Sequence, residues 1–240
     1  MDTDPLSGSS LDIPYLSKDK TLQFVTSALV VLPVFLQAPW AHFNPLSACL
    51  FTLFIFSIGL FIGEFGGQKW FYIGSLCLGV SGSWLGGSLF WGWLREYPVL
   101  HIPVEAVALP IAVIGLSTKW RLGSVFYLAC LFGTALTDVM MVFTGVMHEW
   151  PAVVQAPLNN APEMLNNAAQ KLFNFKSVLV LLISAISIGS LAYLMRKQAK
   201  KSFKESSSWL VASAVLTTTL WVDALFLITA FFQPQLSGLI

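Results

Sequence analysis

The sequence predicts an all-α integral membrane protein, a polytopic bundle of about seven transmembrane helices with a cytoplasmic amino terminus. Hydrophobic residues make up 56% of the 240 residues and charged residues only 10%, whereas soluble domains carry about 25% charged residues. Apolar stretches of about 20 residues, the length that crosses a hydrocarbon core, recur along the chain. Basic residues gather on one side of these stretches, as they do in cytoplasmic loops.

The seven apolar segments cover residues 21–40, 46–63, 70–94, 101–118, 122–147, 175–195 and 209–232. We expect Pro33 to kink the first segment and Pro103 and Pro110 to interrupt the fourth, because proline removes a helical hydrogen bond. Residues 1–20 are acidic, polar and proline-bearing, and they lack the basic start and short apolar core of a signal peptide. They are predicted to be a flexible cytoplasmic tail, and residues 21–240 a single transmembrane domain.

The distribution of Lys and Arg sets the predicted orientation. An odd number of crossings puts the two termini on opposite sides of the membrane. Ten of the thirteen basic residues fall on the side of the amino terminus, and the other side has only Arg95, Lys171 and Lys176. The amino terminus is therefore predicted to be cytoplasmic and the carboxyl terminus not.

One connection is long. Residues 148–174 contain Pro151, Pro157 and Pro162 and then a stretch with apolar residues at helical spacing. We expect a non-cytoplasmic loop or an interfacial helix here, acting either as a passive connector or as a lid over a site.

Several classes of function are excluded. The net charge of +1 gives no bulk attraction to nucleic acid. The chain has no phosphate-binding glycine loop, no nucleotide motif and no nucleophile elbow. Cys49, Cys77 and Cys130 lie inside apolar segments without metal-ligand spacing, so no metal site is predicted.

Ionisable side chains within membrane segments are costly and therefore point to function. The helical rise of about 1.5 Å per residue puts those of this chain in the outer half of the membrane, where they could hold a cation, relay protons or act as general acid and base. Glu105 and His101 share a helix face and are the catalytic candidates. A purely structural role, with Arg95 paired to a carboxylate and the Asp side chains bonded to Thr or Trp, is the alternative. The candidate ligand or ion residues are Arg95, Glu96, His101, Glu105, Asp138 and Asp223.

The third segment carries small residues every four positions, Ser75, Gly79, Ser83 and Gly87, with Trp84 and Trp91 on the same segment. Small residues at this spacing let helices approach closely. The pattern therefore predicts either helix packing or close contact with a flat pigment, and chlorophyll or carotenoid is the candidate cofactor.

The sequence SGSWLGGSLFWGWLREYPVLHIPVEAVALPIA, followed by FYLACLFGTALTD, resembles a family of cyanobacterial multi-pass membrane proteins catalogued as domain of unknown function 3120. The resemblance implies a thylakoid or plasma membrane of a cyanobacterium-like cell, with photosynthetic complexes as candidate partners, and it implies no activity. PVEA at 103–106 is also similar to the Pro-hydrophobic-Glu-Glu element of membrane-embedded carotenoid cyclases, with one Glu in place of two.

Three functions remain open. The favoured one is a non-catalytic pigment- or lipid-binding protein, or an assembly factor for photosynthetic complexes. The second is a proton- or cation-coupled carrier that uses Glu105, Asp138 and Asp223. The third is an intramembrane enzyme acting on an isoprenoid, with Glu105 as acid and His101 as its partner.

Overall fold

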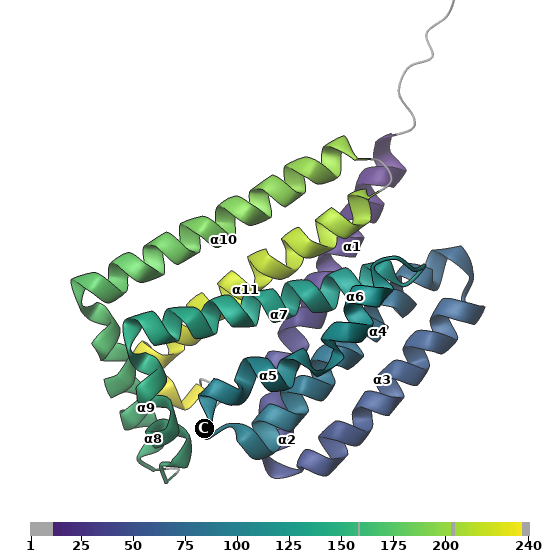
Figure 1. The fold of residues 1–240 in the computed structure, drawn as a ribbon. Helices are drawn as coiled ribbons and strands as arrows, with labels where there is room; N and C mark the ends of the chain where they lie inside the picture. The colour runs from purple at the N-terminus through teal and green to yellow at the C-terminus, as the bar shows by residue number, and fades with distance from the viewer. Residues whose placement is uncertain (1–11, 158, 203–204, 237–240) are drawn as a thin grey trace, which may run out of the picture.

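The computed structural model describes residues 12–157, 159–202 and 205–236, and all regular structure within them is helical (Figure 1). Two π-helical segments, Pro33–Gln37 and Phe90–Leu94, and short 3-10 turns join several α-helices end to end. The α-helices are α1 (Asp12–Leu32), α2 (Ala38–Phe43), α3 (Pro45–Phe65), α4 (Gly67–Leu89), α5 (His101–Glu105), α6 (Leu109–Gly115), α7 (Arg121–Thr144), α8 (Trp150–Gln155), α9 (Ala161–Gln170), α10 (Phe175–Lys201) and α11 (Ser206–Phe232).

Seven helical stretches of the described chain are long and apolar enough to cross a membrane. This confirms the predicted fold class and the number of spans. The largest boundary difference is at the end of the sixth span, where α10 continues through the basic residues as far as Lys201, because Lys, Arg and Gln favour helix beyond the apolar core. The spans are Asp19–Phe43, Pro45–Phe65, Trp70–Leu94, Pro98–Gly115, Arg121–Thr144, Phe175–Lys201 and Ser206–Phe232.

The tail expected over residues 1–20 needs a correction in its second half. Residues 1–11 lie outside the described residues, but α1 already begins at Asp12. Pro14 falls in the first helical turn, where a missing N–H costs little. No further proline interrupts α1 before Pro33, so the helix starts earlier than hydropathy alone suggested.

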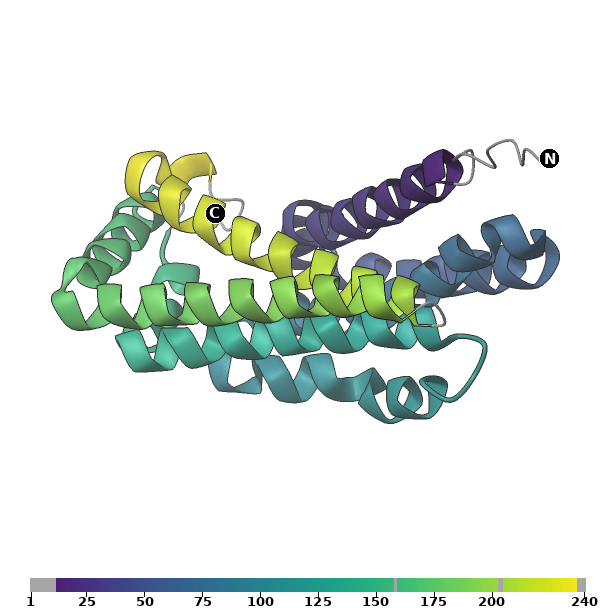
Figure 2. The same ribbon diagram turned by 90° about the horizontal axis from the view of Figure 1, so that it is seen from above.

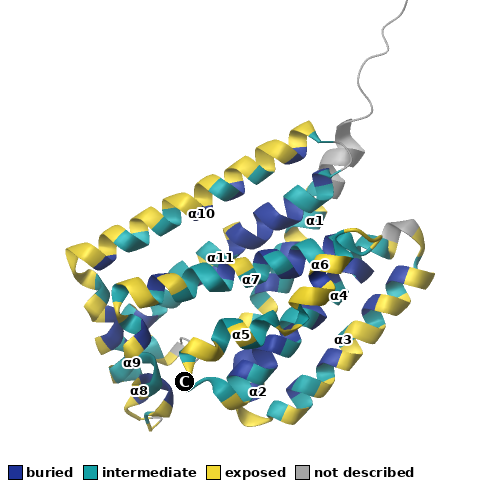
Figure 3. Cartoon of the chain, viewed as in Figure 1, coloured by how far each residue is buried: buried dark blue, intermediate teal, exposed yellow. Residues whose placement is uncertain are grey.

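The centre of the bundle is formed by α4 and α11, the most buried spans (Figure 3). α4 packs against α3 and α7, and α11 packs against α1, α7 and α10. Gly79 permits the close approach of α4 and α7, since a Cβ atom there would collide with the backbone of Gly123. Small residues therefore set the distance between these two helices.

The outer faces of α3 and α10 are largely exposed (Figure 3). Their exposed side chains are apolar and include Phe54, Phe61 and Ile186. An apolar surface of this extent on membrane-length helices is suited to lipid. The chain is thus an integral membrane protein that contacts lipid through its flanking helices.

The helices α8 and α9, which belong to the long connection, lie across one end of the bundle (Figures 1 and 2). We call this the α9 end. The buried face of α9, at Leu165 and Ala168, packs with Val153 and Ala230, and Asn166 donates to the carbonyl groups at the end of α11. The connection therefore rests on the bundle, although its side of the membrane stays a prediction.

Candidate functional site

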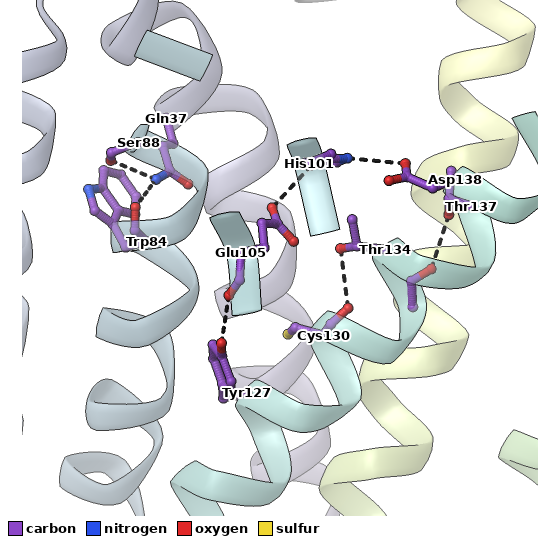
Figure 4. Close-up of polar contacts among 11 residues, drawn as sticks. Gln37, Trp84, Ser88, His101, Glu105, Tyr127, Cys130, Thr134, Thr137 and Asp138 are labelled. Carbon is purple, nitrogen blue, oxygen red and sulfur yellow. Dashed lines mark hydrogen bonds and ion pairs between the residues drawn. The ribbon is translucent and has the colours of Figure 1, made fainter. Parts of the chain in front are cut away.

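The fourth span is broken where it faces the inside of the bundle. Residues Ala106–Ala108 form a 3-10 turn in which the Leu109 N–H donates to the Ala106 carbonyl. The Glu105 carbonyl therefore loses the donor that an α-helix would supply. The Tyr127 hydroxyl of α7 donates to this carbonyl at 2.5 Å (Figure 4). The interruption expected at the prolines of this segment is thus present, and α7 satisfies the freed carbonyl group.

Gly86 of α4 brings the broken span close to the bundle. A Cβ atom on Gly86 would lie 2.7 Å from the Glu105 Cα atom, a distance that packed atoms do not allow. The short helix α5 therefore lies directly on α4. This packing keeps His101 and Glu105 turned toward the bundle interior rather than the lipid.

His101 contacts two carboxyl groups from two different helices (Figure 4). Its Nε2 atom lies 3.3 Å from Glu105 Oε1, one turn along the same span, and its Nδ1 atom lies 3.1 Å from Asp138 Oδ1 on α7. The imidazole ring stacks on Phe90, with ring centroids 4.0 Å apart. We refer to His101, Glu105 and Asp138 as the His101 trio. All three side chains are largely buried, with exposures of 14–18%.

The two contacts of His101 favour a bound proton within the trio. A neutral imidazole has one N–H donor and one bare acceptor nitrogen. If both carboxyl groups were ionised and His101 neutral, one contact would place a nitrogen lone pair against a carboxylate oxygen. One additional proton, on the imidazole or on a carboxyl group, turns both contacts into hydrogen bonds. With that proton the three side chains together carry a net charge of −1.

Asp223 of α11 lies on the other side of the same region. The Thr137 hydroxyl donates to Asp223 Oδ2 at 2.8 Å, and Thr137 precedes Asp138 in the sequence. The expectation that an Asp side chain bonds to a threonine thus holds for Asp223, whereas Asp138 contacts a histidine.

These side chains line a single cavity of about 280 Å³ inside the bundle. Its walls are otherwise mainly apolar and come from α1, α4, α7 and α11, with Leu29, Val80, Phe126, Val222 and Phe226 among them. We call it the inner cavity. The structure therefore brings His101, Glu105, Asp138 and Asp223 together in one cavity lined by membrane-spanning helices.

A polar group that sequence reasoning missed lies on the opposite wall. Gln37, at the end of the first π-helical segment, is buried. Its amide nitrogen donates to the Ser88 hydroxyl at 2.8 Å and to the Trp84 carbonyl (Figure 4). Gly87 leaves the space that the amide occupies. The signal that could have identified it is a lone amide in an apolar segment, four residues after a proline.

The other residues that were missed are Tyr127, Cys130, Phe90 and Met141. Cys130 and Met141 line the inner cavity, and nothing in their local sequence distinguishes them from ordinary packing residues. Tyr127 was the one with a detectable pattern, since a tyrosine inside an apolar helix needs a partner for its hydroxyl.

Arg95 and Glu96 do not join the trio. They line a second cavity of about 440 Å³ at the α9 end, which we call the outer cavity. The Arg95 Nη2 atom donates to the Val154 carbonyl at 3.2 Å, and among the described residues no carboxylate lies within ion-pair distance of it. The Arg95–carboxylate pair of the structural alternative is therefore absent there, and Glu96 instead accepts from Gln155 Nε2 at 3.0 Å.

Burial lowers the pKa of the Arg95 guanidinium from its ordinary value, and the charge of Glu96 partly offsets this. Guanidinium groups stay protonated in proteins. Arg95 thus remains a cation at the mouth of the bundle.

The small residues spaced four apart on α4 lie in two different environments. Ser75 accepts from the Gly123 N–H at 2.9 Å, and Gly79 lies against the same residue, so this half packs helices. Ser83 and Gly87 line the inner cavity instead. The Trp84 indole donates to the Ala48 carbonyl at 2.9 Å.

Trp91 lines both cavities. Its ring meets Phe90 and Trp150 edge to face, with centroids 5.6 and 6.0 Å apart.

Comparison with known proteins adds one finding. No curated protein and no solved structure matches the chain. The model of a family described as "Protein of unknown function (DUF3120)" matches residues 26–231. This confirms the resemblance predicted from residues 81–112 and 126–138. Because the match covers most of the chain, this multi-pass helical membrane protein belongs to the DUF3120 family.

Proposed function

We propose that this protein binds one small, largely apolar ligand, an isoprenoid or a lipid, inside its membrane-spanning bundle without transforming it. The observation that carries the proposal is the inner cavity, whose walls are mainly apolar and whose polar groups come from the His101 trio, Asp223, Gln37 and a few serine and threonine side chains. A mainly apolar pocket with a few convergent polar groups is the usual form of a small-molecule site. The ligand would reach it through lipid or from the α9 end.

The size of the cavity narrows the choice of ligand. A volume of about 280 Å³ lies near the lower end of ligand pockets, which span about 300–1,000 Å³. This favours the ring end of a carotenoid or quinone, or a short isoprenoid chain, over an enclosed chlorophyll. A photosynthetic membrane location and contact with photosynthetic complexes belong to the same proposal, and they are supported by the family resemblance alone.

The test is to purify tagged protein in mild detergent from its native membrane and to identify co-eluting small molecules by absorption and mass spectrometry. Met141 lines the cavity, so Met141→Trp should fill it and Met141→Leu should not. We expect a stoichiometric ligand in the wild-type and Met141→Leu proteins and its loss from a folded Met141→Trp protein. Wild-type protein that elutes with no ligand above background would refute the proposal.

A proton-coupled carrier is the second candidate. The observation in its favour is that the His101 trio, which could bind and release a proton, lies beside a broken span, as ion sites do in many transporters. In proteoliposomes, Asp138→Asn and Asp223→Asn should each abolish proton flux. Glu64→Gln is the matched control, because Glu64 pairs with Lys119 at 2.6 Å outside both cavities. Flux that survives both Asp substitutions would exclude the carrier, and a chemically altered isoprenoid in the same vesicles would indicate an enzyme.

A further inference from the structure

We propose that the outer cavity is an anion site and that the ligand is an amphiphile, with a phosphate or carboxylate group at Arg95 and an apolar body in the inner cavity. This inference rests on the proposed function, because the apolar body needs the inner cavity. It adds to that function a second binding site, the chemical class of the ligand and the orientation in which the ligand binds.

Arg95 has unused donors in the outer cavity. A guanidinium group offers five N–H donors, and the structure gives the Arg95 side chain one hydrogen-bond acceptor, the Val154 carbonyl at 3.2 Å. The Trp150 indole donates to the Arg95 carbonyl at 2.8 Å and fixes its backbone. The backbone of Arg95 is therefore held in place, while no carboxylate of the described chain lies within ion-pair distance of its guanidinium. A cation in this state is stabilised by an anionic ligand, most strongly by a bidentate one.

The neighbours of Arg95 support the same chemistry. His42 of α2 lines the outer cavity as well and adds a ring N–H donor. The one acidic side chain among the lining residues, Glu96, is bonded to Gln155. Arg95 and His42 thus present donors to an anionic oxygen group in a volume of about 440 Å³, while the Gln155 amide donates to Glu96.

The two cavities are adjacent. Ala38 and Trp91 line both of them, so the indole of Trp91 stands at their boundary. A chain that passes Trp91 would extend from the Arg95 guanidinium at the α9 end into the apolar bundle.

The charges that line the two cavities determine which end of the ligand lies in which cavity. The inner cavity holds the His101 trio, with its net negative charge, and Asp223. A phosphate or carboxylate would be repelled there and attracted to Arg95, because like charges repel strongly in a low dielectric. The anionic end should therefore stay in the outer cavity.

The experiment uses full-length protein in phosphatidylcholine nanodiscs, with binding followed by tryptophan fluorescence and native mass spectrometry. The probes are farnesol, farnesyl phosphate and inorganic phosphate. We expect farnesyl phosphate to bind at least about 10-fold more tightly than farnesol, the effect of a charge-assisted hydrogen bond. Arg95→Gln should remove this preference and leave farnesol binding within about twofold, while Arg95→Lys should keep part of the preference.

Lys176→Gln is the matched control, because Lys176 is an exposed basic residue outside both cavities, and it should bind like the wild type. Loss of the preference in nanodiscs doped with phosphatidylglycerol would support the site and identify a bilayer headgroup as its natural occupant. Displacement of farnesyl phosphate by equimolar inorganic phosphate would mean that the apolar chain adds no affinity. That result would overturn the proposal that the ligand is an amphiphile. Equal wild-type affinities for farnesol and farnesyl phosphate, or a preference that survives Arg95→Gln, would overturn the anion site alone. Binding of neither probe would overturn the proposed function with it.

Discussion

At the scale of single residues, His101 is the one whose role depends most on its neighbours. Its two ring nitrogens contact carboxyl groups of the fourth span and of α7, so it joins two elements and lowers the repulsion between two acids. Removal of the imidazole would leave Glu105 and Asp138 beside an apolar cavity with no donor between them. Breaking a buried ion pair by removing one partner is more destabilising than removing all the charges.

We therefore expect His101→Leu to lower the free energy of unfolding by about 3 kcal/mol, the low end for a buried pair, because the trio is not fully buried. The measurement is the melting temperature in detergent. Adding Glu105→Gln and Asp138→Asn to His101→Leu should restore most of the loss, since no unpaired charge then remains. A triple variant less stable than the single one would show that the trio stabilises by something other than charge.

At the scale of elements, the close contact of α4 with α7 is made possible by glycine. A Cβ atom on Gly79 would collide with the Gly123 backbone, and backbone cannot move aside as a flexible side chain can. Gly189 of α10, in contrast, has no neighbouring atom within 4 Å of such a Cβ. The same substitution should therefore have opposite consequences in the two helices.

Gly79→Ala is expected to destabilise the protein by about 1–3 kcal/mol, the usual cost of overpacking, or to abolish monodisperse purification. Gly189→Ala should leave the melting temperature unchanged or raise it slightly, because alanine favours helix. Size-exclusion profiles and melting curves of the two variants test this. Equal behaviour would mean that the α4–α7 contact does not depend on the missing side chain.

Elements also show how far the sequence could predict this structure. The seven spans follow from apolar length, a local property, and were predicted within a few residues. The π-helical segments at Pro33 and Phe90 were not, because they depend on tertiary contacts such as that of Gln37 with Ser88. The start of α1 at Asp12 was missed because hydropathy detects the membrane core and not the helix that extends beyond it.

The candidate site, like the fold, could be predicted from the sequence only in part. Four ionisable residues predicted for the outer half of the membrane do line one cavity, because helix rise alone places them at similar depth. Pairing of Arg95 with a carboxylate was the structural alternative, and the guanidinium donates instead to the Val154 carbonyl. The depth of these residues in the membrane could be inferred from the sequence. The hydrogen-bond partner of each side chain could not, because it depends on which helices are neighbours in the fold.

At the scale of the whole molecule, both cavities belong to the α9 half of the bundle, so their access depends on how the protein sits in the membrane. The described basic residues are unevenly divided between the two ends. Lys119, Arg121 and the last turn of α10 lie at the end opposite α9. The positive-inside rule therefore predicts that the α9 end, with Arg95 and the outer cavity, lies on the non-cytoplasmic side.

This orientation predicts which positions an impermeant maleimide can label in intact cells. In a background with Cys49, Cys77 and Cys130 replaced by alanine, Gln155→Cys at the α9 end should label at once, because Gln155 is exposed. Ser202→Cys, which follows α10 at the opposite end, should label only after the membrane is permeabilised. The reverse pattern would place the outer cavity in the cytoplasm, and its anionic ligand would then have to come from the cytoplasmic leaflet. Labelling of both positions in intact cells would contradict a single orientation and with it the use of charge asymmetry for this chain.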